Sequence, residues 1–343
     1  MKVIRVKDDS RNIAEADFPY SMDKAEQLRF LVNYAIQAPS NHNSQPWKFS
    51  IHDDSMDVMI DKSRMLSFID PHLRQLKISC GAAIGNLEVA AKHFGFEPIV
   101  KICSHKADTD VVATITLGNK VPDDPHNSRL FNAIIQRQTN RRFFVDKPVA
   151  TPLLEVCKNL AAECAVEFTY LTSQEDKKRV ANLSEVAIRH QHNQPWFRRE
   201  FSSRLRRHTS GKTGMSSFGF ASLNLPTPVA RFVMDLFNNG KSSAKFNRRK
   251  ILQGSPAIAI FTTEVDEQEA WLNTGRALSL VLLELCSEGL SASFLHQAIE
   301  VEHLRPQLAK TISSRGISQV MIRIGEAPRV KPSKRRNVDE VFV

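Results

Sequence analysis

The feature that most constrains this fold is a polar loop, residues 38–47, between a predicted helix and a predicted strand. It reads Ala-Pro-Ser-Asn-His-Asn-Ser-Gln-Pro-Trp, with two prolines and small polar side chains that are too polar for a core segment. Apolar residues recur at helical spacing over 23–37, and Trp47, Phe49 and Ile51 alternate with polar residues as in a strand. Such a loop presents backbone N–H groups, hydroxyls and amides at close range, which suits a flat ligand with a hydrogen-bonding edge.

The size and charge of the chain bound the classes of protein it can be. Its 343 residues allow two ordinary domains, or one domain built from two similar halves. The formal net charge of +10 favours an anionic partner, and a phosphorylated cofactor, an acidic protein surface and nucleic acid all fit that sign. Five cysteines without a C-x-x-C pair argue against a disulfide framework. The charged N-terminus has no apolar leader, and no apolar run approaches the ~20 residues of a membrane span, so we expect a cytoplasmic protein without a membrane partner.

The hydrophobic pattern predicts an α+β fold with two similar halves. In the first half we expect a hairpin over 47–60, a small-residue helix over 79–93 that Gly95 caps, and strands near 99–103 and 111–117. In the second half we expect helices near 129–136, 153–162, 173–190 and 269–288, and strands over 166–172, 256–263 and 317–324. Both long helices, 79–93 and 269–288, end before a glycine and precede strand-like sequence. This outline indicates duplication, although no residue-level repeat is visible.

The domain boundaries follow from the same pattern. We expect an N-terminal arm over 1–20, a first half over 21–126 and a second half over 127–343. Residues 191–255 break the regular pattern of the second half with clustered arginines, several glycines and a helix near 229–237. They carry too much apolar surface for a disordered linker. We therefore expect this insert to fold as a lid over the binding pocket or over a vacated second site.

Two basic stretches are candidate phosphate-binding sites. Arg137, Thr139 and Arg141 place two cations and a hydroxyl within five residues, just after a predicted helix. Arginine binds phosphate oxygens bidentately, and a hydroxyl can fill a remaining acceptor site. Taken alone, such a pattern is more often a solvated basic turn. The second stretch is a basic run near the C-terminus, which in most chains is a solvated tail; it consists of Lys334, Arg335 and Arg336.

Together these stretches resemble the nitroreductase family of flavin proteins. The loop resembles the family's Pro-Ser-Ser-x-Asn-x-Gln-Pro-Trp loop. The Arg-x-Thr-x-Arg turn, followed by Phe143, Phe144 and Pro148-Val149, resembles the Arg-x-Ser-x-Arg/Lys start of the family's unit. The strand and glycine over 321–325, followed by basic residues, are similar to the family's ending. The arrangement is most similar to the Acg-type subgroup, in which one chain carries both halves, and it spans residues 25–340 apart from the insert.

The resemblance implies a nitroreductase-like fold, with the two halves forming an internal pseudo-dimer around the long central helices. Because the reciprocal motifs are missing, it implies one FMN per chain. Asn43 is the best candidate for the pyrimidine oxygen of the flavin, and His296 or Gln297 would face its reactive edge. The full set of residues expected to bind the cofactor is Pro39, Ser40, Asn41, Asn43, Arg137, Thr139, Arg141, His296, Gln297, Lys334, Arg335 and Arg336.

The implied function is that of an FMN-dependent oxidoreductase, which passes hydride from NAD(P)H through FMN to a small acceptor such as a nitroaromatic or a quinone. The alternative is an FMN-binding or sequestering protein with little turnover, since the insert could exclude substrates. Nucleic-acid binding through the basic clusters 198–212 and 241–250 is disfavoured because they lack interleaved aromatic residues. No metal site is expected, because a pair such as His190-x-His192 is more often a surface pair. We expect a monomer with an internal pseudo-twofold, and further dimerisation is left open.

Overall fold

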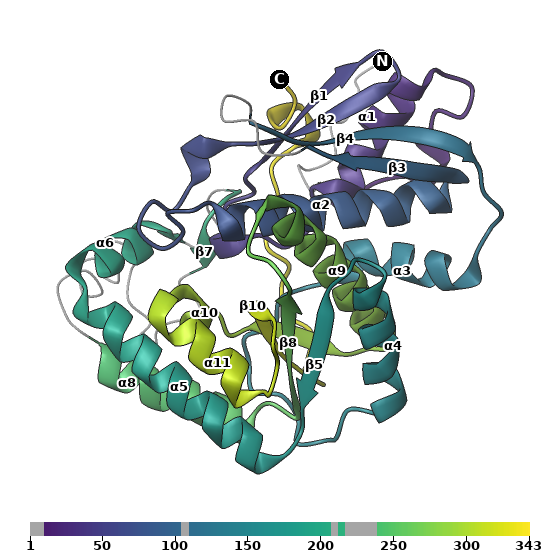
Figure 1. Cartoon of the computed structure of the whole chain (residues 1–343). Helices are drawn as coiled ribbons and strands as arrows, with labels where there is room; N and C mark the ends of the chain where they lie inside the picture. The colour runs from purple at the N-terminus through teal and green to yellow at the C-terminus, as the bar shows by residue number, and fades with distance from the viewer. Residues whose placement is uncertain (1–9, 104–109, 207–211, 217–238) are drawn as a thin grey trace.

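The computed structural model describes residues 10–103, 110–206, 212–216 and 239–343, and it has two halves that each combine an antiparallel sheet with helices (Figure 1). The elements of the first half are α1 (Lys24–Ala35), β1 (Trp47–His52), β2 (Ser55–Ile60), α2 (Arg74–His93), β3 (Phe96–Ile102) and β4 (Val111–Lys120). Those of the second half are α3 (Pro125–Gln136), α4 (Thr151–Ala162), β5 (Glu167–Leu171), α5 (Gln174–Asn193), α6 (Pro195–Ser203), β6 (Leu205–Arg206), β7 (Met215–Ser216), α8 (Gly240–Gln253), β8 (Ala257–Thr263), α9 (Gln268–Ser287), β9 (Ser291–Phe294), α10 (Gln297–Glu300), α11 (Arg305–Thr311) and β10 (Ile317–Gly325). Short 3-10 segments are η1 (Glu15–Asp17), η2 (Asn41–Asn43), η3 (Lys62–Arg64), η4 (Glu302–Leu304) and η5 (Val338–Glu340).

The two main sheets have the same topology. Their strand orders are β1-β2-β4-β3 and β5-β8-β10-β9, and every neighbouring pair is antiparallel. In each half the long helix follows the second strand in chain order, and the next two strands pair with each other. The predicted α+β class with two similar halves is therefore confirmed. The predicted boundary at 126/127 falls inside α3, so a boundary between β4 and α3 fits the elements better.

The long helices α2 and α9 pack against each other at the centre of the molecule (Figure 1), as the sequence predicts. Both have 20 residues, and Gly81 and Gly275 occupy the same position, seven residues after the first. A Cβ atom on Gly81 would lie 2.1 Å from the carbonyl oxygen of Leu272, and one on Gly275 would lie 2.1 Å from that of Ile78. Ile78 and Leu272 are also equivalent positions, so the contact is reciprocal. At this crossing, equivalent residues of the two halves make equivalent contacts, as a pseudo-twofold axis requires.

The ends of the two long helices repeat the correspondence. Gly95 and Gly289 each follow the last helical residue by two positions and have φ of 85° and 77°. Such positive φ values suit glycine, which has no Cβ. The hydrophobic cores also interlock, since Leu272 and Leu283 of α9 pack in the core of the first half, and Ile78 of α2 packs in that of the second.

The C-terminal tail joins the second half to the first. After β10 the chain returns to the side of β1 (Figure 1). There the N–H of Phe49 donates to the oxygen of Val341 at 2.8 Å, and the N–H of Val343 donates to the oxygen of Phe49 at 3.0 Å. The basic residues 334–336 lie on this crossing. They are therefore brought from the far end of the chain to the polar loop of the first half.

The insert lies between β5 and β8, where the first half has only the short turn between β1 and β2. Its described part contains α6, α8 and residues 212–216, while the predicted helix near 229–237 lies outside the described residues. Helix α6 docks on the first half, because the Glu200 carboxylate accepts from the N–H groups of Phe68 and Ile69 at 3.2 and 2.9 Å. Phe197 packs there with Leu66 and Ile69. Within the described ranges, no helix is long and apolar enough to cross a membrane.

Candidate functional site

A cavity of about 710 Å³ is lined by residues of both halves. The polar loop, helix α2, the turn after α3, the β9–α10 connection, the insert and the C-terminal tail all contribute to its wall. Every residue expected to bind the cofactor lines it except two. Those that line it are Pro39, Ser40, Asn41, Asn43, Arg137, Thr139, Arg141, His296, Gln297 and Arg335.

The polar loop holds its backbone in an unusual conformation at the edge of this cavity. Three of its residues, His42, Asn43 and Gln45, have positive φ values of 51°, 55° and 51°. Such values are costly for residues that carry a Cβ, and they persist only where neighbouring contacts hold them. Here the N–H of Asn41 donates to the hydroxyl of Ser79 on α2 at 3.3 Å, and the N–H of Gln45 donates to the hydroxyl of Ser40 at 3.0 Å.

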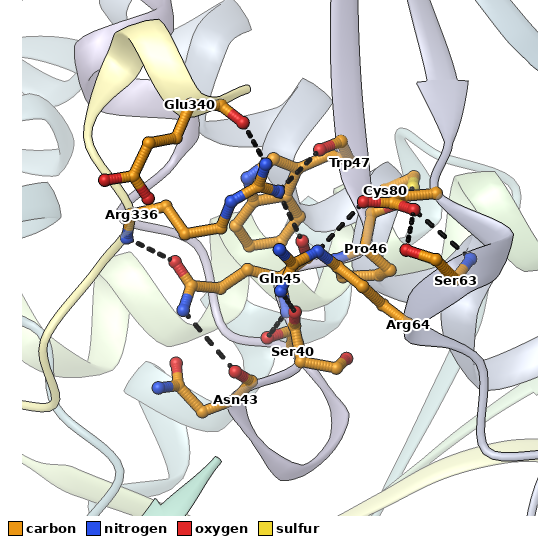
Figure 2. Close-up of polar contacts among 12 residues, drawn as sticks. Ser40, Asn43, Gln45, Pro46, Trp47, Ser63, Arg64, Cys80, Arg336 and Glu340 are labelled. Carbon is orange, nitrogen blue, oxygen red and sulfur yellow. Dashed lines mark hydrogen bonds and ion pairs between the residues drawn. The ribbon is translucent and has the colours of Figure 1, made fainter. Parts of the chain in front are cut away.

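The Gln45 side chain connects the loop to two distant segments, and Figure 2 shows part of this network. Its Nε2 donates to the oxygen of Lys212 in the insert at 2.7 Å, and its Oε1 accepts from the N–H of Arg336 in the tail at 2.8 Å. Gln45 is fully buried. One amide therefore joins the loop, the insert and the C-terminal tail.

Gln45→Leu is expected to lower the free energy of unfolding by about 1–3 kcal/mol, because an apolar group of similar size leaves a buried N–H and a buried carbonyl without partners. Chemical denaturation at a fixed cofactor concentration measures this change. Gln307→Leu on α11 is the matched control, since Gln307 is exposed and its side chain donates one long hydrogen bond, at 3.4 Å, to the carbonyl oxygen of His303 in η4. Equal stabilities of the two variants would contradict the prediction.

The two predicted residues outside the lining have other roles. The Arg336 guanidinium donates to the carbonyl oxygens of Gln45 and Trp47 at 3.3 and 3.4 Å, and to that of Glu340 (Figure 2). Lys334 is exposed. The prediction that Lys334 and Arg336 bind the cofactor phosphate is therefore not supported by the geometry.

Asn43 lines the cavity, but its amide already bonds to protein groups. Its Nδ2 lies 3.2–3.4 Å from the carbonyl oxygens of Lys212, Gly214 and Lys334, and its Oδ1 accepts from Arg335 at 3.0 Å. A role in binding the pyrimidine of a flavin stays a prediction, and it would require this amide to exchange partners.

Arg137 and Arg335 approach each other on the cavity wall from distant parts of the chain. Both donate to the carbonyl oxygen of Gln37, at 3.3 and 3.2 Å. Arg137 is only 4% exposed, and its Nε has no hydrogen-bond partner among the described residues. Burial, and then the nearby Arg11 cation, lowers the pKa of Arg137 to about 10, so it still carries its charge at neutral pH. Two cations that share one carbonyl in a buried wall favour a bound anion.

The local backbone explains why alternate residues of the 137–141 turn contribute. This segment runs beside β9, with a bridge between Thr139 and Ala292 and a hydrogen bond from the N–H of Asn140 to the oxygen of Ala292 at 3.0 Å. Successive side chains of an extended segment point to opposite sides. Arg137, Thr139 and Arg141 therefore share one side and all line the cavity.

The charges on the cavity wall are strongly unbalanced. Glu300 is the single acidic side chain among the described lining residues, and burial raises its pKa. It accepts hydrogen bonds from Gln75 at 3.2 Å and Gln191 at 2.8 Å. The cationic lining residues are Arg11, Arg137, Arg141, Lys250, Arg323 and Arg335.

Two histidines in the wall are neutral at physiological pH. Burial is the main cause that lowers the pKa of both His42 and His296 to about 3, and nearby cations add to it. Arg141 and Arg204 act on His42, whereas Arg74 acts on His296. A neutral imidazole offers one donor and one acceptor, so both rings can bind a polar ligand without adding charge.

Several lining residues were not predicted from the sequence. Arg11, Gln75 and Glu300 gave no sequence signal, because their roles depend on which segments the fold brings together, whereas His42 lies within the polar loop but was not itself singled out. Helix α8 did carry a signal, since six polar or aromatic residues recur at helical spacing on the face that lines the cavity. They are Asn239, Ser242, Ser243, Phe246, Asn247 and Lys250.

Comparison with known proteins supports the resemblance seen in the sequence. No protein-family model matches the chain. The chain is 28% identical over 324 residues to the Mycobacterium tuberculosis protein named "Putative NAD(P)H nitroreductase Rv3131", covering 92% of this chain and 91% of that protein. It is 24% identical over 343 residues to the protein of the same organism named "Putative NAD(P)H nitroreductase acg", covering 94% and 97% of the two chains.

A solved structure also matches, the FMN and NADPH-dependent nitroreductase NfnB from sphigopyxis sp. strain HMH. It is 17% identical, covers 62% of this chain and 96% of that chain, and has a TM-score of 0.42. The curated relatives, which match nearly the whole chain, confirm its resemblance to the nitroreductase-like family and give it an Acg homologue.

Proposed function

We propose that this chain is an FMN-dependent oxidoreductase that takes electrons from NAD(P)H and passes them to a small acceptor such as a nitroaromatic or a quinone. The observation that carries this proposal is the pair Arg137 and Arg335, which meet at the carbonyl of Gln37 in the wall of a large cavity. The names of the relatives that match over most of the chain support the same activity.

The donors and acceptors of the cavity fit FMN. Its phosphate needs cations, which Arg137 and Arg335 supply, and its ribityl chain and pyrimidine need a mixture of donors and acceptors. Several buried side-chain atoms of the wall have no hydrogen-bond partner among the described residues, and they include both kinds. Among them are Asn41 Nδ2, His42 Nδ1, Gln75 Oε1, Arg137 Nε, Gln138 Oε1, His192 Nδ1, Asn247 Oδ1, His296 Nε2 and Gln297 Oε1.

The residues of the chain would bind and orient the cofactor, while bound FMN supplies the two-electron transfer between nicotinamide and acceptor. Arg137 and Arg335 would hold the phosphate, and the polar loop with His296 and Gln297 would fix the orientation of the ring. Phe197 and Phe201 of the insert, which also line the cavity, would exclude water from the reacting face.

An anaerobic titration of the purified holoprotein with NADPH and NADH tests the proposed activity. We expect bleaching of the oxidised flavin absorbance and its return when a quinone or a nitroaromatic is added. A holoprotein that stays oxidised would favour the alternative function, an FMN-binding or sequestering protein. The position of the insert supports that alternative, because α6 is hydrogen-bonded to the first half and both α6 and α8 line the cavity, where they could exclude substrates.

If the insert acts as a lid, weakening its attachment should widen access to the cavity. Glu200→Ala removes the carboxylate that accepts from Phe68 and Ile69, and we expect kcat/KM for bulky acceptors to rise several-fold, with small quinones changing less. The matched control is Glu175→Ala on α5, where the exposed carboxylate pairs with Arg179 of its own helix. A fall in kcat/KM for both classes, with FMN retained, would mean that the insert builds the substrate site.

A further inference from the structure

Helix α8 presents one face to the cavity along most of its length. Asn239, Ser242, Ser243, Phe246, Asn247 and Lys250 follow the i, i+3, i+4, i+7, i+8, i+11 spacing of one helical face, and all line the cavity. A face that only closed the pocket over an apolar acceptor would be expected to be apolar. This one is polar, and the buried Oδ1 of Asn247 has no partner among the described residues.

The end of that face carries a cation beside an aromatic ring. The Nζ of Lys250 lies 4.6 Å from the centre of the Phe246 ring. Phe246 is 51% exposed, and its ring lies edge-on to Phe143 at 5.9 Å. An ammonium next to an accessible aromatic surface is an arrangement that suits a planar molecule with an acidic substituent.

The cations of the cavity fall into two electrostatic groups. Arg11 acts on the pKa of Arg137, and Arg335 shares the Gln37 carbonyl with it. Separately, Arg323 and Arg141 act on Lys250, whose pKa falls to about 8 through burial first and these two cations second. Arg323 bonds to the backbone oxygens of Gly254, Asn140 and Arg142, and Arg141 and Lys250 line the same cavity.

We propose that Lys250, with Arg141, forms a second anion subsite in this cavity, separate from the phosphate site of Arg137 and Arg335. It would bind the acidic group of the planar molecule that exchanges electrons with the flavin, with Phe246 beside its ring. This inference rests on the proposed function, because it assigns a substrate class to the same cavity. The acidic group could be a carboxylate of the acceptor or the additional phosphate that distinguishes NADPH from NADH.

The test compares binding of benzoate and benzamide to the oxidised holoprotein by calorimetry, since the two probes have similar shapes but differ in charge. We expect Lys250→Gln to weaken benzoate at least about tenfold while changing benzamide less than about twofold, because it removes one charge-assisted hydrogen bond. Lys245→Gln is the matched control, because Lys245 is an exposed residue of the same helix. It should change neither affinity.

Steady-state kinetics distinguish the two sources of the acidic group. A rise in KM for NADPH but not for NADH in Lys250→Gln would identify the nucleotide phosphate, and weaker benzoate binding with unchanged nucleotide KM values would identify an acidic acceptor. The proposal is overturned if Lys250→Gln changes neither benzoate binding nor the preference for NADPH. It is also overturned if this variant loses FMN, since Lys250 would then belong to the flavin site.

Two measurements distinguish a failure of this subsite from a failure of the proposed function. A wild-type holoprotein that NAD(P)H does not reduce would contradict the proposed activity, whereas calorimetry with benzoate needs no turnover and still reports the subsite. Benzoate affinity should also be steady below about pH 7 and fall several-fold towards pH 9, because Lys250 must be protonated to bind the anion, and burial and the cations Arg323 and Arg141 lower its pKa to about 8. A flat profile in wild type would contradict the role of Lys250.

Discussion

Gly275→Ala is expected to lower the free energy of unfolding by more than ~3 kcal/mol, although alanine normally stabilises the middle of a helix relative to glycine. Its Cβ would lie 2.1 Å from the carbonyl oxygen of Ile78 and 2.6 Å from the backbone nitrogen of Ala82. These are backbone atoms of α2, so relief requires the two central helices to move apart. Such a movement would loosen the cores of both halves, because they share residues of these helices.

Denaturant unfolding at a fixed, saturating FMN concentration measures this effect, since a bound ligand stabilises the folded state. Gly81→Ala should be equally damaging, because its Cβ meets the oxygen of Leu272 at the same 2.1 Å. Gly85→Ala is the graded control, since its nearest contact is the Cβ of Ser279 at 2.8 Å and its backbone contacts begin at 3.1 Å. An unchanged free energy of unfolding in the Gly275→Ala variant would contradict the close crossing of α2 and α9.

Replacing both Arg137 and Arg335 by alanine is expected to reduce FMN affinity by about 3–6 kcal/mol, because each removes hydrogen bonds between charged partners that contribute about 1.5–3 kcal/mol. The single variants should each show about half of this loss. The pair is the strongest candidate for the phosphate site, since both guanidiniums reach one carbonyl in a buried wall. Added salt should lower the affinity of the wild-type protein for FMN less than it would at a site made of surface charges, because buried charges are poorly screened.

Fluorescence titration of the apoprotein with FMN gives these affinities. Arg129→Ala is the matched control, since Arg129 is an exposed residue of α3 that pairs with Glu288. It should leave the affinity for FMN unchanged. Unaltered FMN retention in the Arg137 and Arg335 double variant would remove both residues from the phosphate site.

Local sequence patterns predicted much of the fold. The small-residue helices 79–93 and 269–288 are α2 and α9, and the hairpin over 47–60 forms β1 and β2. The sequence did not reveal the repeat at residue level, because the correspondence lies in a few positions such as Gly81 and Gly275. Glycine is required at those positions only because the two helices cross there, and the sequence does not show that contact.

The candidate site was predictable where one short segment carries it. The polar loop and the Arg-x-Thr-x-Arg turn both line the cavity, as their side-chain chemistry indicates. The sequence predicts a phosphate site at the basic run near the C-terminus without separating its three residues, but consecutive residues of an extended chain point in different directions. Arg335 therefore lines the cavity, whereas Lys334 is exposed and Arg336 is buried against Gln45 and Trp47. No local pattern could have joined Gln75 to Glu300, because 225 positions separate them.

The most direct test of the proposed cofactor site is the number of FMN molecules that one chain binds. The apoprotein, at a concentration well above the dissociation constant, is titrated with FMN while the flavin absorbance and fluorescence are recorded. The cavity of the described residues, with its single Arg137 and Arg335 pair, predicts a sharp end point at one FMN per chain, and reduction of that flavin by NAD(P)H. An end point at two FMN per chain, or no saturable binding at all, would contradict the account.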